Sequence, residues 1–112
     1  MSLGKKQELF SRNLNKLITW IYANTDFEIR RGETQRPLMM QKYYVSVGKS
    51  WTLNGAHLKK LAADLFFSKD GKMVWSHESL KEVGEYWKSL HPQNEWGGDW
   101  QKKDVPHFEM KA

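Results

Sequence analysis

Residues 61–75 read LAADLFFSKDGKMVW, and this stretch decides which kind of sheet the chain can form. Residues 61–67 are apolar and short enough for a buried strand. Residues 68–72 contain an Asp-Gly pair, which favours a tight turn between antiparallel strands. Residues 73–75 then read as the returning strand. The stretch therefore predicts a β-hairpin and a sheet with antiparallel pairing.

Three segments outside this hairpin have the spacing of amphipathic helices. Apolar residues three or four positions apart predict a helix over residues 6–23. Pro37 suits the first turn of a second helix over about 37–47, and a third covers 76–90. Residues 27–31 and 107–110 predict two more strands, and residues 94–103 a loop rich in Trp and Gly. The sum is a single α+β domain over residues 1–112, with a mostly antiparallel sheet flanked by about three helices.

The composition narrows the possible classes of protein. The chain has 112 residues, 39% of them hydrophobic, and six are Trp, which is enough for one core. It has no Cys, which excludes a disulfide framework, a Cys-ligated metal site and a cysteine nucleophile. Eighteen Lys and Arg against thirteen Asp and Glu give a net charge of +5, which suits an anionic partner. The basic residues are scattered, however, so much of this charge can be explained by solubility alone.

No apolar run reaches the roughly 18 residues that a membrane span requires, so we expect none. The first residues lack the apolar segment and small-residue cleavage site of a signal peptide. We therefore expect synthesis in the cytoplasm. Action outside the cytoplasm would then require release by another agent.

One strand carries a residue that does not fit its surroundings. Asp64 lies inside the apolar segment 61–67, where an unpaired carboxylate would be costly to bury. A cation or a metal ion could be its partner. The alternatives are a structural ion pair with Arg or Lys, or exposure at the edge of the sheet. His57, seven residues earlier, could equally be an ordinary surface residue.

A second group of metal-ligand side chains lies near the C-terminus. Asp104 and His107 are separated by Val105 and Pro106, and the proline keeps the preceding residue extended. The two side chains are therefore expected to lie near each other at the start of a strand. Two His and one Asp, with a second Asp beside them, match a catalytic zinc site that keeps one position for water. By itself this combination is weak, because the residue types are common.

Several segments resemble motifs of the zinc D,D-carboxypeptidase and endopeptidase family, peptidase family M15. Residues 54–65 (NGAHLKKLAADL) resemble its Ser-x-His-x-x-Gly-x-Ala-x-Asp motif. Residues 104–109 (DVPHFE) resemble its second motif, which has an acidic residue three positions before the last His ligand. The upstream segment 36–44 (RPLMMQKYY) is similar to the family's Tyr-Arg-Thr-x-x-x-Gln segment. Residues 84–87 (GEYW) and 96–100 (WGGDW) are like those of small phage and prophage members, so the resemblance covers about residues 6–110.

This resemblance implies a fold like that of the hedgehog and D,D-peptidase proteins, and a role for each matching residue. His57, Asp64 and His107 take the places of the Zn²⁺ ligands. Asp104 takes the place of the general base, which is Asp in the phage L-alanyl-D-glutamate endopeptidases. Arg36 takes the place of the Arg that steadies or polarises the substrate carbonyl.

Two positions depart from the family motif. Its Ser is Gly55 here, so a hydroxyl that could assist substrate binding is missing. Its Gly is Lys60, where a long side chain replaces a residue that allows close packing; we expect Lys60 to face solvent. Trp96 and Trp100, in the Gly-rich loop just before the site, are candidates for lining a substrate groove.

The expected function is hydrolysis of peptidoglycan stem peptides by a zinc peptidase. Resemblance to phage and prophage endolysins points to L-alanyl-D-glutamate endopeptidase activity. The alternatives are a D-alanyl-D-alanine carboxypeptidase or dipeptidase, and a catalytically degenerate module that binds cell wall or nucleic acid. We expect a monomer whose partner is the peptidoglycan peptide and not a nucleic acid.

Overall fold

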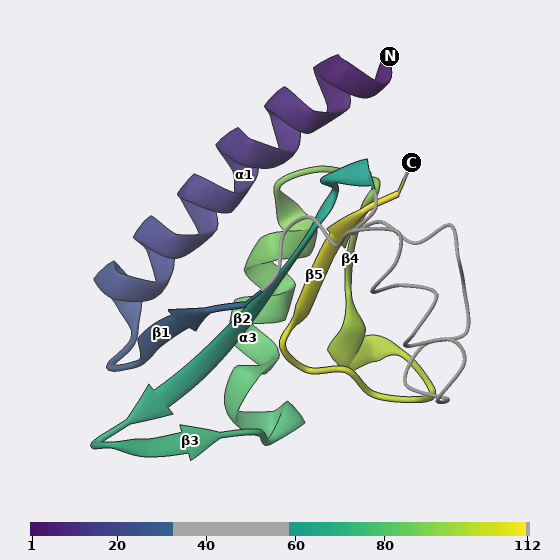
Figure 1. Ribbon diagram of the computed structural model, residues 1–112. Helices are drawn as coiled ribbons and strands as arrows, with labels where there is room; N and C mark the ends of the chain where they lie inside the picture. Colours follow the sequence, from purple (N-terminus) through teal and green to yellow (C-terminus); the bar gives the residue numbers. More distant parts are fainter. Residues whose placement is uncertain (33–58, 112) are drawn as a thin grey trace.

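The computed structural model describes residues 1–32 and 59–111 (Figure 1). Within these residues, two α-helices, five strands and a short 3-10 helix follow one another. They are α1 (Leu3–Asn24), β1 (Glu28–Arg31), β2 (Ala62–Lys69), β3 (Lys72–Val74), α3 (His77–Ser89), β4 (Asn94–Trp96), η2 (Gly97–Asp99) and β5 (His107–Met110). The helices expected over 6–23 and 76–90 are confirmed. The helix expected over 37–47 lies outside the described residues.

Helix α1 is defined by a capped start and a buried stripe. The Ser2 side chain accepts a hydrogen bond from the Lys5 backbone N–H at 3.2 Å, which satisfies one of the free donors of the first turn. The helix packs against the core through buried residues at helical spacing, namely Phe10, Leu17 and Ile21. Beyond the helix, the chain turns directly into β1.

The five strands form one antiparallel sheet in the order β1-β2-β5-β4, with β3 paired to β2. Both β1 and β3 pair with Phe67 and Ser68, so they lie on opposite edges of β2. The expected hairpin is confirmed. Asp70 and Gly71 have φ angles of 52° and 79°, as a type I′ turn between β2 and β3 requires. The expectation of a mostly antiparallel sheet is confirmed, and β2 is its central strand.

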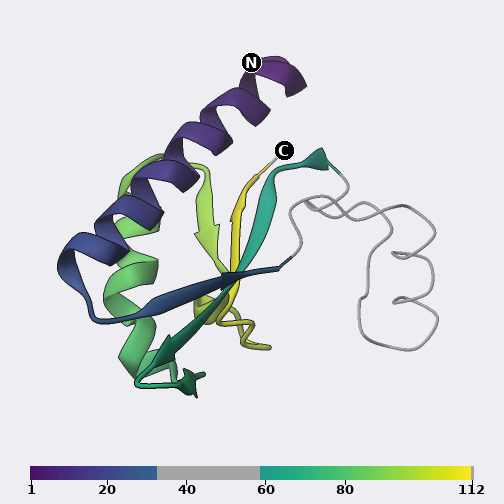
Figure 2. The ribbon, with the colours of Figure 1, turned by 60° about the vertical axis from the view of Figure 1, so that its left-hand side comes forward.

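The two faces of β2 differ in character. Ala63, Leu65 and Phe67 are buried, whereas Asp64 and Phe66 on the opposite face are half-buried. Figure 2 shows α1 and α3 together on one side of the sheet. These three buried residues of β2 belong to the core on that side, together with the fully buried Trp87 and Phe108. Asp64 is therefore directed to the sheet face that α1 and α3 do not cover.

The segment over residues 94–103 is more ordered than the sequence suggests. The loop prediction is wrong for its first half, where β4 pairs with β5 and η2 follows. The Trp96 side chain is fully buried, and its indole N–H donates to the Val105 carbonyl at 2.7 Å. Its ring stacks on His77, with ring centroids 5.1 Å apart. Trp96 is therefore a core residue, which corrects its assignment to a substrate groove.

Gly84 in α3 makes room for this indole. A Cβ atom at position 84 would lie 2.1 and 2.3 Å from two carbons of the Trp96 ring. We expect Gly84→Ala to lower the free energy of unfolding by about 2–3 kcal/mol, because the rigid ring must shift within a packed core. Thermal unfolding measures the effect, with Gly4→Ala in α1 as the matched control. Position 4 has no atom within 4 Å, so that substitution should stabilise the helix by up to about 1 kcal/mol. Equal melting temperatures for the two variants would contradict the packing described here.

Candidate active site

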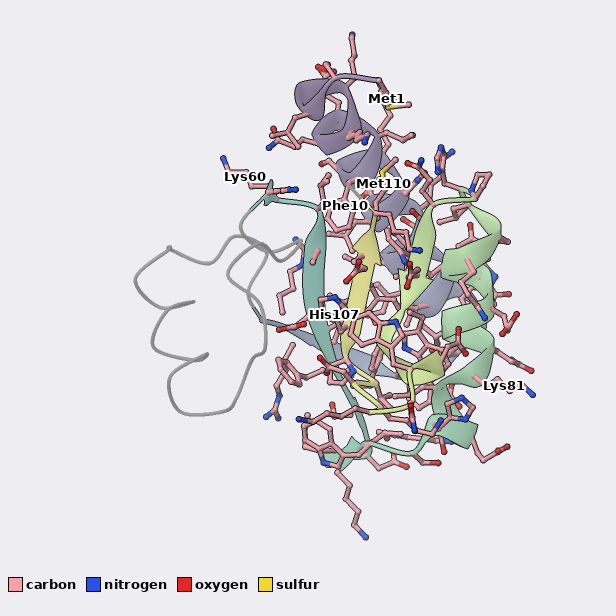
Figure 3. The ribbon with its side chains drawn as sticks, turned by 90° about the vertical axis from the view of Figure 1, so that its right-hand side faces the viewer. Met1, Phe10, Lys60, Lys81, His107 and Met110 are labelled. Atoms are coloured by element: carbon pink, nitrogen blue, oxygen red, sulfur yellow. The ribbon has the colours of Figure 1, made fainter. Side chains whose placement is uncertain are left out.

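Asp64 and His107 face each other across two paired strands. They are direct partners in the β2–β5 register, so both side chains lie on the same face of the sheet. The Asp64 Oδ1 and His107 Nδ1 atoms are 3.4 Å apart, and the two side chains are 20% and 9% exposed. Figure 3 shows His107 at the start of β5, beside β2. The structure thus brings together two residues that are 43 positions apart in the sequence.

Glu109 fixes the other side of the His107 ring. Its Oε1 atom lies 2.7 Å from His107 Nε2, and it shares a face with His107 because it is two residues further along β5. In a neutral imidazole this contact places the proton on Nε2 and leaves the Nδ1 lone pair directed toward Asp64. Glu109 therefore sets the orientation of the ring, and also its tautomer whenever the imidazole is neutral.

The charge of His107 follows from these two carboxylates. Burial lowers its pKa, but hydrogen bonds to Asp64 and Glu109 outweigh burial and raise the pKa from 6.5 to about 9. Without a metal, the ring is therefore an imidazolium at neutral pH, shared between two acidic side chains. The site concentrates negative charge around a single imidazole.

The surroundings of Glu109 and His107 include a second carboxylate, a lysine and an aromatic ring. Glu95 on β4 lies directly opposite Glu109, a like-charge pair that needs compensation. The Lys111 Nζ atom lies 2.9 Å from Glu95 Oε2, close enough for an ion pair although it lacks hydrogen-bond alignment. Trp100 donates from its indole to Glu95 Oε1 at 3.3 Å, and its ring centroid is 5.0 Å from that of His107. Glu109 thus has the His107 imidazolium as its cationic neighbour, and Glu95 has Lys111. The Trp100 ring covers part of the imidazole.

Asp104 lies in the turn that leads into β5. Its backbone N–H donates to the Gly97 carbonyl at 2.9 Å, and its own carbonyl accepts the His107 N–H at 3.0 Å. The Pro106 carbonyl accepts from the Leu65 N–H at 2.9 Å, which ties the same turn to β2. The expected closeness of Asp104 to His107 is supported by this turn. The point where a Gly97 Cβ would lie is 3.0 Å from the Cβ atoms of both residues.

The remaining motif residues fall in the part of the chain that is not described. Arg36, His57 and Gly55 lie within residues 33–58, so their places in the site stay predictions. Among residues 1–32 and 59–111, no three His, Cys, Asp or Glu side chains are grouped closely enough to hold a metal ion.

Lys60 is exposed, as expected. Its φ angle is 57°, in the left-handed region that glycine adopts without strain. The backbone conformation therefore favours glycine at this position. We expect Lys60→Gly to raise the free energy of unfolding by up to about 1 kcal/mol, measured by chemical denaturation. Lys59→Gly is the control, and a Lys60→Gly variant no more stable than wild type would contradict the strain.

Two contributors to the site were less visible in the sequence. Glu109 could be connected to His107 through the two-residue period of a strand. Glu95 could not, because its segment read as a loop and its pairing with β5 was not anticipated. Residues 94–96 read Asn-Glu-Trp, so the alternating burial of this strand in the structure has no counterpart in the sequence as an apolar–polar alternation.

An aspartate facing a carboxylate-supported histidine, with a second aspartate at the adjoining turn, is a donor set typical of metal-dependent hydrolases. The comparisons agree with a hydrolase, and specifically with a peptidase. The family model described as D-alanyl-D-alanine carboxypeptidase, within peptidase family M15, matches residues 48–110. This is more than half of the chain, so the protein belongs to that family and is a peptidase.

One solved structure extends the comparison to the whole fold. The chain is similar to the L-Ala D-Glu endopeptidase ChiX of Serratia marcescens, with 25% sequence identity and a TM-score of 0.72. The match covers 89% of this chain and 79% of that one. No curated protein sequence matches the chain significantly. Neither described helix is long and apolar enough to cross a membrane.

Proposed function

We propose that this peptidase is zinc-dependent and cleaves the stem peptides of bacterial peptidoglycan, at the bond between L-alanine and D-glutamate. The observation that carries the proposal is the facing pair of Asp64 and His107, with Glu109 behind the imidazole. The similarity to an L-Ala D-Glu endopeptidase supports the choice of bond. The match to the carboxypeptidase family model supports the reaction class.

The geometry of the pair suits zinc. The Asp64–His107 hydrogen bond, at 3.4 Å between Nδ1 and Oδ1, is at the long limit for such a bond. This distance is close to the separation of about 3.3 Å between two tetrahedral ligands that each lie about 2.0–2.1 Å from Zn²⁺. We propose Asp64 and His107 as two of the ligands and His57, outside the described residues, as the third. When bound, zinc would polarise the scissile carbonyl and lower the pKa of a water molecule.

The other proposed roles belong to residues that handle protons and substrate. Asp104, held at the turn before His107, would take the proton of the attacking water and return it to the leaving amine. Arg36 would steady the carbonyl oxygen as negative charge develops. Of the two aromatic candidates for the substrate groove, we propose Trp100, which is partly exposed and lies against His107.

Glu109→Gln tests the support behind the imidazole. We expect zinc affinity to fall by about 10–100-fold, because the amide binds the ring less firmly than the carboxylate does. Competition with a zinc chelator of known affinity measures the change. Glu82→Gln, an exposed position on α3, is the control. An unchanged affinity in Glu109→Gln would remove Glu109 from the support of the site.

The reaction itself is tested by product analysis. Purified peptidoglycan is incubated with the protein, with and without a chelator, and the products are identified by mass spectrometry. New D-glutamate amino ends, abolished by the chelator and restored by zinc, would establish the proposed reaction. Released D-alanine would instead establish the second candidate, a D-alanyl-D-alanine carboxypeptidase or dipeptidase, which the family description favours.

The biological setting is part of the same proposal. We infer a monomeric endolysin of phage or prophage type, made in the cytoplasm and released to act on the wall. The net charge of +5 supports adsorption to anionic wall material, and this adsorption should weaken as salt increases. A nucleic-acid-binding module is disfavoured, because Asp64, Glu95 and Glu109 line the same sheet face as the site.

A further inference from the structure

Gly97, the first residue of η2, packs its backbone directly against the turn that carries Asp104. A Cβ atom at position 97 would lie 2.2 Å from the Asp104 carbonyl oxygen. It would also lie 3.0 Å from the Cβ atoms of Asp104 and His107. Its three nearest atoms therefore belong to the proposed base and a proposed metal ligand.

A series of backbone hydrogen bonds connects Gly97 to Asp104 and Asp104 to His107. The Gly97 carbonyl accepts from the Asp104 N–H at 2.9 Å and from the Trp100 N–H at 3.2 Å. The Asp104 carbonyl in turn accepts from the His107 N–H at 3.0 Å. Gly97 thus links the Asp104 turn to the end of β4, in addition to the pairing of β4 with β5.

The requirement for glycine here is close approach and not an unusual backbone conformation. Among the described glycines, Gly71 alone has a positive φ angle. Gly97 is buried, and its neighbour in the tight contact is a backbone carbonyl, which cannot rotate away as a flexible side chain could. Any side chain at this position must therefore displace the turn itself.

We propose that Gly97 is a positioning residue for the peptidase reaction. By lacking a Cβ atom, it lets the turn pack close enough to hold the Asp104 carboxylate and the His107 imidazole in register with Asp64. This inference rests on the proposed function of those residues. A misplacement of about 1 Å at a reacting group can cost about 100-fold in rate, and the 2.2 Å contact requires a displacement of that order.

The test compares Gly97→Ala with Gly98→Ala. The neighbouring position is a matched control, since its Cβ would lie 2.3–2.5 Å from three atoms of the buried Trp96 ring. Both variants should therefore lose thermal stability, and both are assayed well below their melting temperatures. Gly97→Ala alone should lose about 10–100-fold in zinc affinity, with about 100-fold in kcat. The absorption spectrum of its cobalt-substituted form should also change, because that spectrum reports ligand geometry.

Equal effects of the two substitutions on zinc affinity and kcat would overturn the proposal, since general destabilisation would then explain both. A Gly97→Ala protein with zinc affinity within about threefold of wild type would overturn it as well. If wild type neither binds zinc nor cleaves peptidoglycan, the proposed function fails, and with it the positioning role for that reaction.

A measurement on wild type covers the case in which Gly97→Ala does not fold. Native-state hydrogen exchange should show the Asp104 amide protected at least about tenfold relative to an unstructured chain, because Gly97 accepts its hydrogen bond. Exchange of the Asp104 amide at the unprotected rate would show that its hydrogen bond to Gly97 does not hold the turn, and would overturn the proposal.

Discussion

His107→Ala is expected to abolish zinc binding and to lower turnover by at least about 100-fold, more than the loss expected from altering a supporting residue. The substitution removes a proposed ligand and also leaves Asp64 and Glu109 facing each other without the imidazole between them. Metal analysis of the purified variant, together with the peptidoglycan assay, measures both effects.

His91→Ala is the matched control for this substitution. His91 lies beyond α3, where its Nδ1 atom accepts the Gln93 N–H at 3.1 Å, and it has no proposed role in the site. It should retain about one zinc per chain and full turnover. If His107→Ala also retained zinc and turnover, His107 would be removed from the ligand set, and the tetrahedral interpretation of the 3.4 Å distance would be wrong.

Asp104→Asn is expected to keep zinc but to lower kcat by about 100- to 10,000-fold. The amide has nearly the same shape as the carboxylate, so the turn and its backbone hydrogen bonds should remain. It cannot accept a proton from water at neutral pH, however, and this is the role proposed for Asp104. Zinc content and steady-state kinetics on the same preparation separate the two properties.

Asp70→Asn provides the control for the loss of a carboxylate. Asp70 is exposed at the β2–β3 turn, and its φ angle of 52° is one that Asn tolerates. Turnover should therefore be unchanged. Retained turnover in Asp104→Asn would mean that another group is the base. Loss of zinc in that variant would mean that Asp104 acts in metal binding instead.

Much of the fold could be predicted from local patterns. The Asp-Gly turn, the apolar run before it and the three-to-four spacing in the helices each act over a few residues, so the sequence displays them directly. Strand β4 was missed because it has only three residues and owes its structure to pairing with β5. Such tertiary pairing leaves little local signal.

The site was predictable only in part. Asp64 was conspicuous because a carboxylate in an apolar strand needs a partner. The identity of that partner required the β2–β5 register, which joins residues distant in the chain. For Trp96 the local pattern was misleading, because its Gly-rich setting suggested exposure. The indole instead occupies the space that Gly84 and Gly98 leave by having no side chain. The placement of Arg36 and His57 remains a prediction.

The pairing of Asp64 with His107 across two strands also has a consequence for energetics. The unfolded chain separates these residues by 43 positions, so it does not present them together to an ion. A metal held by them would therefore bind the native state selectively and stabilise it by mass action. Free zinc at about 100 times its dissociation constant would add about 2.7 kcal/mol to the free energy of unfolding. The melting temperature of the protein would then report the concentration of free zinc around it.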